Sequence, residues 1–274
     1  MKKLSMYCLT LNPNHLEKIK YLNYIPVGLG ENNFSSNWLT DKTEDNIAKK
    51  NSFYGEYTFH YSIWKHILNT IETEWVGFCQ YRKFWLKKKI NSNIKNLNDL
   101  KYHILADLPE NINSLESIVG EPFFINQFRL SKFVKRNLLT MVKSPSLFFS
   151  KNKRNIKFHF DMWHGKGNLE KAINLLDEKN KNDFTKFVNE NVSFNPHNMF
   201  ICKKEVLINY YNVIFPWLEK CESIFGFTKS NDYGQKRIYG FLAERFLSYW
   251  FTKNTKFTTM PILFKDITDL NLDA

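Results

Sequence analysis

The sequence predicts a globular protein of the α/β class, and three observations lead to that class. Short apolar runs typical of buried strands alternate with longer segments in which apolar residues recur every three or four positions. Hydrophobic residues make up 43% and charged residues 24% of the 274 residues, close to the average of globular domains. Aromatic residues account for 16%, which is too much apolar mass for a chain that stays disordered in water.

Two strands are expected near the start of the chain. The apolar run 4–11 predicts the first strand, and Asn12-Pro13-Asn14 ends it. Residues 24–30 predict the second strand, which runs into a glycine-containing turn. The polar segment 31–50 that follows is expected to be a loop.

The clearest helix of the N-terminal half is expected between residues 54 and 71. An apolar stripe with spacings of three and four consists of Tyr54, Tyr57, Tyr61, Trp64, Leu68 and Ile71. Residues 75–79 predict a compact buried strand, which the polar residues 80–83 follow at once. Polar residues just past the carboxyl end of a buried strand are where α/β folds bind ligands.

The C-terminal part predicts one more strand and two helices. Residues 195–202 are typical of a loop that enters a strand. Residues 204–224 predict a helix that Pro216 should kink. Residues 235–251 predict a second helix, on which one face away from the core combines Arg237, Gly240, Glu244 and Ser248.

The net charge of +12 is concentrated in one segment. Residues 122–160 contain no Asp or Glu but nine Lys and Arg, interleaved with aromatic and aliphatic residues. Such a mixture can lie on an anionic membrane surface, hold the phosphates of a ligand or nucleic acid, or form a solvated face. Because one segment carries most of the excess charge, this distribution favours the membrane and phosphate interpretations more than a uniform distribution would.

The sequence also excludes several classes of protein. No apolar run approaches the ~18–20 residues that a membrane span needs, and the apolar stretch after the first lysines is too short for a signal peptide. Four singly scattered cysteines predict buried, reduced thiols of a cytoplasmic protein rather than a zinc ribbon or a disulfide scaffold. No P-loop, G-x-G-x-x-G, H-E-x-x-H or G-x-S-x-G string occurs.

Polar residues before and at the start of the aromatic helix are the first candidates for a binding site. Asp45 and Asn46 lie in an acidic loop, where they can bind ribose hydroxyls or a base edge, or act only as turn residues. Lys50 precedes the helix, and Glu56 near its start is also explained by the helix dipole alone.

A second group follows the strand at 75–79. The guanidinium of Arg82 can clamp a diphosphate and Tyr81 can stack on a uracil ring, although Arg82 can equally pair with an acidic neighbour. Further along the chain, His159, Asp161 and His164 form an H-x-D-x-x-H cluster. Its spacing matches no established metal motif, so no metal site is predicted.

The region of the C-terminal helix supplies the third group. Arg237 and Glu244 lie two turns apart on one face, so one of them can face the mouth of a site. Asp232 precedes this helix, and a carboxylate at a helix N-terminus stays ionised, which suits a general base. A helix cap is the alternative for Asp232.

Several strings in a fixed order show a resemblance to a known family. They are 24–30 (YIPVGLG), Asp45-Asn46-Ile47 with Lys50-Asn51, 54–65 (YGEYTFHYSIWK), 77–84 (GFCQYRKF), 198–201 (NMFI), Trp217-Leu218, Arg237 with Gly240, and 242–245 (LAER). Together they resemble the bacterial family of domain of unknown function 4422. Its members sit in capsule, lipopolysaccharide and exopolysaccharide clusters and are regarded as glycosyltransferases. The resemblance covers most of the chain except the basic segment 122–160.

The resemblance implies a GT-A-like nucleotide-sugar transferase fold, with a central, mostly parallel sheet flanked by helices. It implies one glycosyltransferase domain over residues 1–274, with the basic segment 122–160 as an insertion, a UDP-sugar donor of the galactose type, and a glycan or lipid-linked glycan acceptor. The family string often has His where this chain has Gln80, whose amide can still hydrogen-bond a sugar hydroxyl. A Mn2+ or Mg2+ cofactor stays open, because no D-x-D motif follows a hydrophobic strand.

The resemblance also distributes roles over the candidate residues. Asp45 and Asn46 are expected at the nucleoside. Arg82 and Lys50 are expected at the diphosphate, where they would offset the charge that builds on the leaving group. The donor sugar or the acceptor would be surrounded by His197, Asn198, Arg237, Asp232 and Glu244. An inverting enzyme needs one carboxylate as its base, and the last two residues are the candidates.

Two other interpretations compete with the transferase. A non-catalytic nucleic-acid-binding protein would suit the charge of +12 and the aromatic content, but no RRM, KH or zinc-finger string is present. A membrane-associated scaffold without catalysis is the weaker rival. The transferase interpretation expects no nucleic-acid partner and a cytoplasmic protein, peripheral at the inner face of the plasma membrane where segment 122–160 binds an anionic surface.

Overall fold

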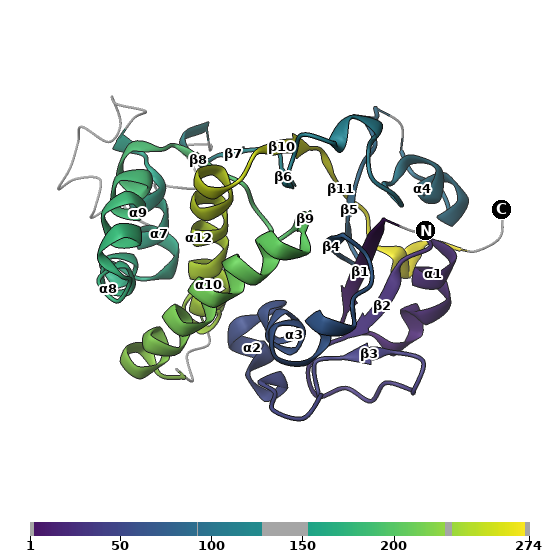
Figure 1. Cartoon of the computed structure of the whole chain (residues 1–274), viewed down its shortest axis with the longest axis horizontal. Coiled ribbons are helices and arrows are strands. Elements are labelled where there is room, and N and C mark those ends of the chain that lie inside the picture. Colours follow the sequence, from purple (N-terminus) through teal and green to yellow (C-terminus); the bar gives the residue numbers. More distant parts are fainter. Residues whose placement is uncertain (1–2, 92, 128–152, 228–231, 272–274) are drawn as a thin grey trace.

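A nine-stranded sheet forms the centre of the computed structural model, which describes residues 3–91, 93–127, 153–227 and 232–271 (Figure 1). The strands are β1 Leu4–Thr10, β2 Ile25–Gly28, β3 Leu39–Thr40, β4 Trp75–Gln80, β5 Lys83–Trp85, β6 Ser117–Gly120, β9 Phe200–Lys203, β10 Phe257–Met260 and β11 Ile262–Phe264. The main order is β10-β6-β9-β4-β1-β2-β3, and the short β5 pairs with both β4 and β11. A separate pair consists of β7 Phe123–Phe124 and β8 Ser193–Phe194.

Most neighbours along the main path run parallel, which confirms the predicted α/β fold. β1 pairs in parallel with β2 and β4, and β6 pairs in parallel with β10. The exception is β9, which is antiparallel to β4 and to β6. Because β9 runs the opposite way, its first residue lies at the edge where β1 and β4 end.

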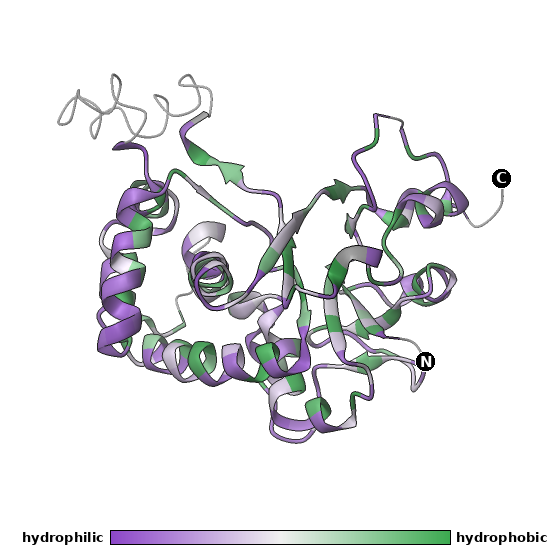
Figure 2. Ribbon diagram, turned by 45° about the horizontal axis from the view of Figure 1, so that its top comes forward, coloured by the Kyte–Doolittle hydropathy of each residue, from purple (hydrophilic) through white to green (hydrophobic). Residues whose placement is uncertain are grey.

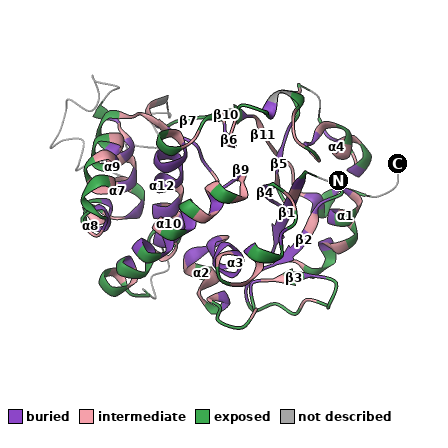
Figure 3. Cartoon of the chain, viewed as in Figure 1, coloured by how far each residue is buried: buried purple, intermediate pink, exposed green. Residues whose placement is uncertain are grey.

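Both faces of the sheet are buried, as Figure 3 shows for β1 and β4 at its centre. On β4, Trp75 and Cys79 pack into the core on the side of α1 (Leu16–Tyr21) and α4 (Leu97–His103). Val76 and Phe78 pack into the core on the other side. Successive side chains of a strand alternate between faces, so Gln80 lies on the face of Val76 and Phe78 at the carboxyl end of β4.

The other α-helices of the described residues lie on the side of the core that contains Val76 and Phe78. They are α2 Asn51–Tyr54, α3 Tyr57–Ser62, α7 Ile156–His164, α8 Asn168–Ile173, α9 Glu178–Glu190, α10 Lys204–Phe225, α11 Tyr233–Lys236 and α12 Ile238–Asn254. α7, α8 and α9 contact one another at one end of the molecule, with α12 beside α7 and α9 (Figure 1). Hydrophilic residues dominate α9, whose buried side chains are Phe184 and Val188 (Figure 2).

The expected aromatic helix is present but interrupted. Gly55, with a φ of 60°, separates α2 from α3, and the helical run then changes to a π-helix at Ile63–Ile67 and a 3-10 turn at Leu68–Thr70. A Cβ at residue 55 would lie 1.9 Å from an Arg237 nitrogen, so a glycine is required there. The prediction missed this break because the apolar stripe continues across it.

The C-terminal predictions agree with the structure apart from one boundary. α10 continues through Pro216, and α12 begins at Ile238 after the separate short helix α11. All four cysteines are buried and free, as predicted. In the described part of the chain, no helix is long and apolar enough to span a membrane. The proposed single domain with an insertion at 122–160 stays a prediction, and residues 128–152 lie outside the described residues.

Candidate active site

Adjacent cavities form a groove along the edge of the sheet where β1, β2 and β4 end. One of about 410 Å3, here called the cationic cavity, is lined by residues that include Gly30, Lys49, Asn51, Lys236 and Arg237. One of about 600 Å3, here called the aromatic cavity, lies over α7, α11 and α12. Two pockets of about 70 and 80 Å3, here called the neck, share Arg237 with the first cavity, and the larger of them shares Glu244 with the second. These shared residues make the four spaces neighbours, and together they are called the groove.

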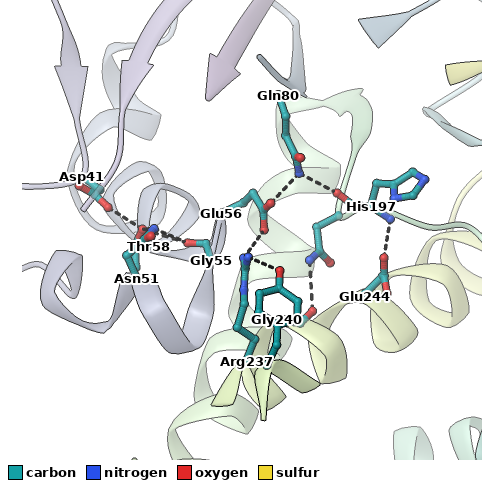
Figure 4. A network of polar contacts seen from close by, with 12 residues as sticks. Asp41, Asn51, Gly55, Glu56, Thr58, Gln80, His197, Arg237, Gly240 and Glu244 are labelled. Carbon is teal, nitrogen blue, oxygen red and sulfur yellow. Dashed lines mark hydrogen bonds and ion pairs between the residues drawn. The ribbon is translucent and has the colours of Figure 1, made fainter. Parts of the chain in front are cut away.

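A chain of charged and polar side chains crosses the neck (Figure 4). Gln80 at the end of β4 donates from Nε2 to Glu56 Oε1 at 2.6 Å and to the carbonyl of His197 at 3.2 Å. The other oxygen of Glu56 faces Arg237 Nη2 at 3.4 Å, and Arg237 Nη1 donates to the Tyr233 hydroxyl at 2.7 Å. Four segments far apart in the sequence therefore meet at Glu56.

The loop before β9 is fastened to α12 at three successive turns. Asn198 Nδ2 donates to the carbonyl of Gly240 at 3.1 Å, and the backbone N–H of His197 donates to Glu244 Oε1 at 2.6 Å. One turn further, Ser248 accepts from the backbone N–H of Asn195 at 2.9 Å. The helix face predicted to combine residues 240, 244 and 248 therefore holds this loop.

His197 and Asn198 adopt a strained backbone conformation. Their φ angles are 82° and 52°, in a region that side chains other than glycine seldom occupy. Such strain costs on the order of 1–3 kcal/mol per residue and persists where the surroundings impose it, often at functional sites. Here the bonds to α12 impose it, and they hold the backbone of His197 between Gln80 and Glu244.

A buried carboxylate fixes the backbone that lines the cationic cavity. Asp41 is fully buried, and both of its oxygens accept from the N–H of Gly30 at 3.0 Å. Oδ2 also accepts from the Thr58 hydroxyl at 2.5 Å, and Asn51 donates to Thr58 and to the carbonyl of Gly55 (Figure 4). Burial raises the pKa of Asp41, although these hydrogen bonds act in the opposite direction. The network fixes the turn after β2 against the start of α3.

The aromatic cavity contains exposed rings and buried histidines. The exposed fractions are 52% for Phe123, 37% for Trp163 and 60% for Tyr233. Burial, assisted by the positive charge of Arg245, lowers the pKa of His159 to about 2 and that of His164 to about 3. Both histidines are therefore neutral at physiological pH.

The charges of the neck are also shaped by burial. Burial lowers the pKa of Lys83, partly offset by Glu56 and Glu244. Burial and then the charge of Lys83 lower the pKa of His197 to about 3. For Arg237, burial acts to lower the pKa, but Glu56 and Tyr233 outweigh it and the pKa is raised. Arg237 is thus a permanent cation in the middle of the groove.

Among the predicted nucleotide-binding residues, Gln80, Tyr81 and Arg82 line the neck. Arg82 is exposed and lines both neck pockets. Tyr81 packs beside the ring of His15, with 5.1 Å between the centroids. The structure therefore brings these three residues to the same place as the end of β1.

Asp45, Asn46 and Lys50 take up other positions. Asp45 accepts from the Tyr61 hydroxyl at 3.2 Å, and the Asn46 side chain accepts from the N–H of Ala48 in a local turn. Lys50 donates to both oxygens of Glu222, at 2.8 and 2.9 Å. The lining of the groove in the described part of the chain comes from other residues, and Lys49 stands at the cationic cavity where Lys50 was expected.

The residues predicted around the sugar fall at the neck and the aromatic cavity. His197, Asn198, Arg237 and Glu244 line the neck, and Glu244 also lines the aromatic cavity. Asp232 lines the aromatic cavity too, and its Oδ1 caps α11 by accepting from the N–H of Gly234 at 2.8 Å.

Two residues of the neck were not predicted. Glu56 was explained by its helix position, and Lys83 was passed over beside Arg82. The contact of Glu56 with Gln80 joins residues 24 apart, and its contact with Arg237 joins residues 181 apart. The available signal was that each lies inside a string of the family resemblance, Tyr54-Gly55-Glu56 and Arg82-Lys83.

The groove does not provide an evident metal site. In the described ranges, no three His, Cys, Asp or Glu side chains lie together as metal ligands. Both carboxylates of the neck already have partners. Glu56 contacts Gln80 and Arg237. Glu244 accepts from the N–H of His197 and pairs with Arg245. In the H-x-D-x-x-H cluster, Asp161 instead accepts from the N–H of Gly167 at 2.9 Å. Within the described residues, the groove therefore holds no preformed set of ligands for a divalent cation.

The mixed α/β architecture, with its central, mostly parallel sheet, recurs in a solved structure. It is similar to the apo structure of the bifunctional glycosyltransferase WbbM, with a TM-score of 0.70 and 16% sequence identity over 96% of this chain. The chain spans 45% of the WbbM chain. By sequence, the chain belongs to the family described as Domain of unknown function (DUF4422), which matches residues 5–255. The family expected from the strings of the sequence is therefore confirmed.

Two mannosyltransferase structures match with TM-scores too low to support an argument. Core-mannan synthase A from Aspergillus fumigatus, in a Mn/GDP form, gives 0.33 with 12% identity over 99% of this chain and 72% of that chain. Ktr4p from S. cerevisiae, in complex with GDP, gives 0.30 with 12% identity over 98% and 68%. No curated protein matches the sequence.

Proposed function

We propose that this protein is a glycosyltransferase that moves a sugar from a nucleotide-sugar donor to a growing glycan. The observation that carries the proposal is the neck, where the cations Arg82, Lys83 and Arg237 line the same pocket as the carboxylates Glu56 and Glu244. In an open α/β sheet, ligands bind at the carboxyl ends of the strands, which is where this pocket lies. A UDP-galactose type of donor and a capsular, lipopolysaccharide or exopolysaccharide acceptor rest on the family resemblance.

The donor would lie in the cationic cavity and the neck. Lys49 and Lys236 line the cavity, and Arg237 lines both it and the neck, so three cations line the space. A diphosphate is dianionic or more, and a planar guanidinium can hold two of its oxygens at once. These cations would bind the diphosphate and offset the charge that develops on it as it leaves.

Glu244 is the carboxylate best placed to act as the base. It lines both the neck and the aromatic cavity, whereas Glu56 lines the neck alone and Asp232 the aromatic cavity alone. In an inverting displacement, the acceptor hydroxyl oxygen bonds to the anomeric carbon as the bond to the diphosphate oxygen breaks. The bonding pair leaves with UDP, and the hydroxyl proton passes to Glu244.

An anionic membrane surface is the proposed location of the acceptor. The apolar part of the proposed contact is Phe123 and Phe124, with exposed fractions of 52% and 47%. Of the basic residues, Lys153 is exposed but Arg154 is buried and donates to the carbonyl of Asn126 at 3.4 Å. Lys151 and the other cations of 128–152 lie outside the described residues. Exchanging Lys151 and Lys153 for Gln should reduce partitioning to vesicles containing phosphatidylserine, and unchanged partitioning would contradict the membrane contact.

Calorimetric titration with UDP tests the proposed function directly. The protein is titrated with UDP, ADP and GDP, with and without Mn2+, and with a single-stranded RNA at two salt concentrations. Selective binding of UDP supports the transferase, and the effect of Mn2+ on the affinity measures metal dependence. Absence of nucleotide binding together with salt-sensitive RNA binding would replace the transferase by a nucleic-acid-binding protein.

A further inference from the structure

The hairpin that joins β4 to β5 places a lysine beside Gln80. Gln80 ends β4 and Lys83 begins β5, and the two residues are direct partners in the antiparallel ladder. Side chains of such a pair project from the same face of a sheet. Because Gln80 donates to Glu56 on the face of the groove (Figure 4), Lys83 enters the neck from that face and lines its larger pocket.

Lys83 is half-buried and forms no ion pair with the residues that the structure describes. The two carboxylates of its pocket pair with arginines instead, Glu56 with Arg237 and Glu244 with Arg245. An ammonium carries three N–H donors, and partly burying them without acceptors is unfavourable. The Lys83 ammonium is therefore placed to donate to oxygen atoms of a ligand in the neck.

Phe264 holds the lysine side chain at this place. The residue pairs with Lys83 across β5 and β11, and its ring centroid lies 5.9 Å from Lys83 Nζ. An ammonium at such a distance from an aromatic ring is attracted to it. The same ring packs edge-on against the ring of His197, with 4.9 Å between the centroids and an interplanar angle of 84°. Phe264 therefore keeps the ammonium close to the loop before β9.

The other two cations of the pocket are less suited to the atom at which charge develops. Arg237 faces Glu56 and donates to the Tyr233 hydroxyl, so part of its donor capacity is already used. Arg82 is exposed, and water weakens the electrostatic effect of an exposed cation. Lys83 is shielded from water in part, so its charge acts in a medium of lower dielectric constant.

The charges of the pocket match a leaving diphosphate better than an intact donor. The cations Arg82, Lys83 and Arg237 outnumber the carboxylates Glu56 and Glu244, so the pocket carries excess positive charge. When the bond to the sugar breaks, the phosphate next to the sugar gains a negative charge. The excess positive charge is therefore compensated best after that bond has broken.

We infer that Lys83 is a catalytic residue, which donates a hydrogen bond to the phosphate oxygen that leaves the sugar. This inference rests on the proposed function, because it assigns the leaving-group side of the same reaction. As the bond between the anomeric carbon and that oxygen breaks, the bonding pair stays on the oxygen. The ammonium keeps its proton and offsets the new charge. Because the charge is largest after cleavage, the contact increases turnover more than it strengthens donor binding.

Calorimetry with UDP and UMP tests this contact without requiring turnover. Lys83→Met removes the charge and keeps an unbranched side chain that adapts to its surroundings. The affinity for UDP should fall about tenfold, as for the loss of one charge-assisted hydrogen bond. The affinity for UMP, which lacks the terminal phosphate, should stay within about twofold. Lys88→Met removes an exposed lysine outside the lining of the neck and should change neither affinity.

Two further variants and a rate measurement sharpen the test. Lys83→Arg keeps a cation and should keep most of the preference for UDP over UMP, within about threefold. Lys83→Gln is a second uncharged variant, and it decides the test if Lys83→Met does not fold. Release of UDP from UDP-galactose should show a kcat about 100-fold lower in the uncharged variants, while KM changes less than about threefold.

The outcomes separate this inference from the function on which it rests. If the uncharged variants bind UDP as tightly as the unmodified protein, or lose affinity for UDP and UMP equally, the inference is overturned and the proposed transferase stands. An unchanged kcat in these variants would also overturn it. If UDP does not bind to the unmodified protein, the proposed function fails, and the role of Lys83 fails with it.

Discussion

The two ends of the groove differ in charge although the short helix α11 lines both. In the described residues, the cationic cavity has Lys49, Lys236 and Arg237 against one carboxylate, Glu31. The aromatic cavity has two carboxylates against one paired cation, together with neutral histidines and exposed rings. A transfer reaction needs this asymmetry, because one substrate leaves as an anion while the other reacts through a neutral hydroxyl. In the proposed function, bond cleavage would occur at the neck, where Glu56, Arg237 and Glu244 lie between the two environments.

The largest effect is expected where the two ends meet. Glu244→Gln removes the proposed base but keeps an oxygen that can accept from the N–H of His197. It also leaves the buried guanidinium of Arg245 without its counter-charge, so the thermal unfolding midpoint should fall and turnover is compared at a temperature where the variant is folded. Turnover should fall by about 1,000-fold, within the range that general-base catalysis contributes. Release of UDP from UDP-galactose measures this rate, and the affinity for UDP should not change.

Asp232→Asn is the matched comparison for that variant. Asn caps helices as well as Asp, so α11 keeps its cap and UDP release should stay within about twofold. If Asp232→Asn abolished turnover while Glu244→Gln did not, Asp232 would take over as the base.

The cationic end should respond in binding rather than in turnover. Arg82→Ala removes one exposed cation of the neck, and the affinity for UDP should fall about tenfold, as for the loss of one charge-assisted hydrogen bond. Because Arg82 is exposed, the thermal unfolding midpoint should be unchanged. Unchanged affinity would remove Arg82 from the site.

The aromatic end should contribute to the loss of stability in acid, together with other histidines whose pKa burial lowers, such as His60 and His197. His159 and His164 have folded-state pKa values of about 2 and about 3, below the ordinary 6.5, so the unfolded chain takes up their protons first as the pH falls. Their contribution to stability is complete above pH 6.5 and is lost below it, by up to about 1.4 kcal/mol per pH unit for each histidine. Urea unfolding at pH 7.5, 6.5 and 5.5 measures the slope. His164→Gln should make it shallower, and an equal slope in that variant would contradict the assignment.

The smallest effects should separate two neighbouring lysines. Lys49→Ala removes a cation of the cationic cavity, and the affinity for UDP should fall about threefold, with a weaker dependence on salt. Lys50→Ala leaves Glu222 without its cation, although the Tyr54 hydroxyl still donates to that carboxylate, so the variant should lower the unfolding midpoint and leave UDP affinity unchanged. If Lys50→Ala lowered the affinity for UDP and Lys49→Ala did not, Lys50 would be the residue that binds the nucleotide, as expected from the sequence.

Sequence reasoning worked where a local pattern reports a local structure. The buried strand at 75–79 and the polar residues after it were predicted because alternation and a sharp change of polarity lie within ten residues. The shared helix face of Gly240 and Glu244 followed from helical spacing alone. Glu56 was missed because its partners Gln80 and Arg237 come from distant segments, and no local pattern encodes that meeting. The sequence could not show whether Lys49 or Lys50 lines the groove. Both lie in the short turn before α2, and the direction of each side chain depends on how that turn is wound.

The position of the antiparallel strand β9 in the sheet affects how the protein can fold during its synthesis. β9 lies between β4 and β6, although some 80 residues separate it from β6 in the chain. When only the first half of the chain has been synthesised, β4 and β6 are present but β9, which pairs with both, is not. The carbonyl of His197, which accepts from Gln80, is also still missing. Contacts of such long separation form slowly. The groove is therefore incomplete until β9 and, after it, Arg237 and Glu244 have emerged, and UDP binding to nascent chains of increasing length would show when it forms.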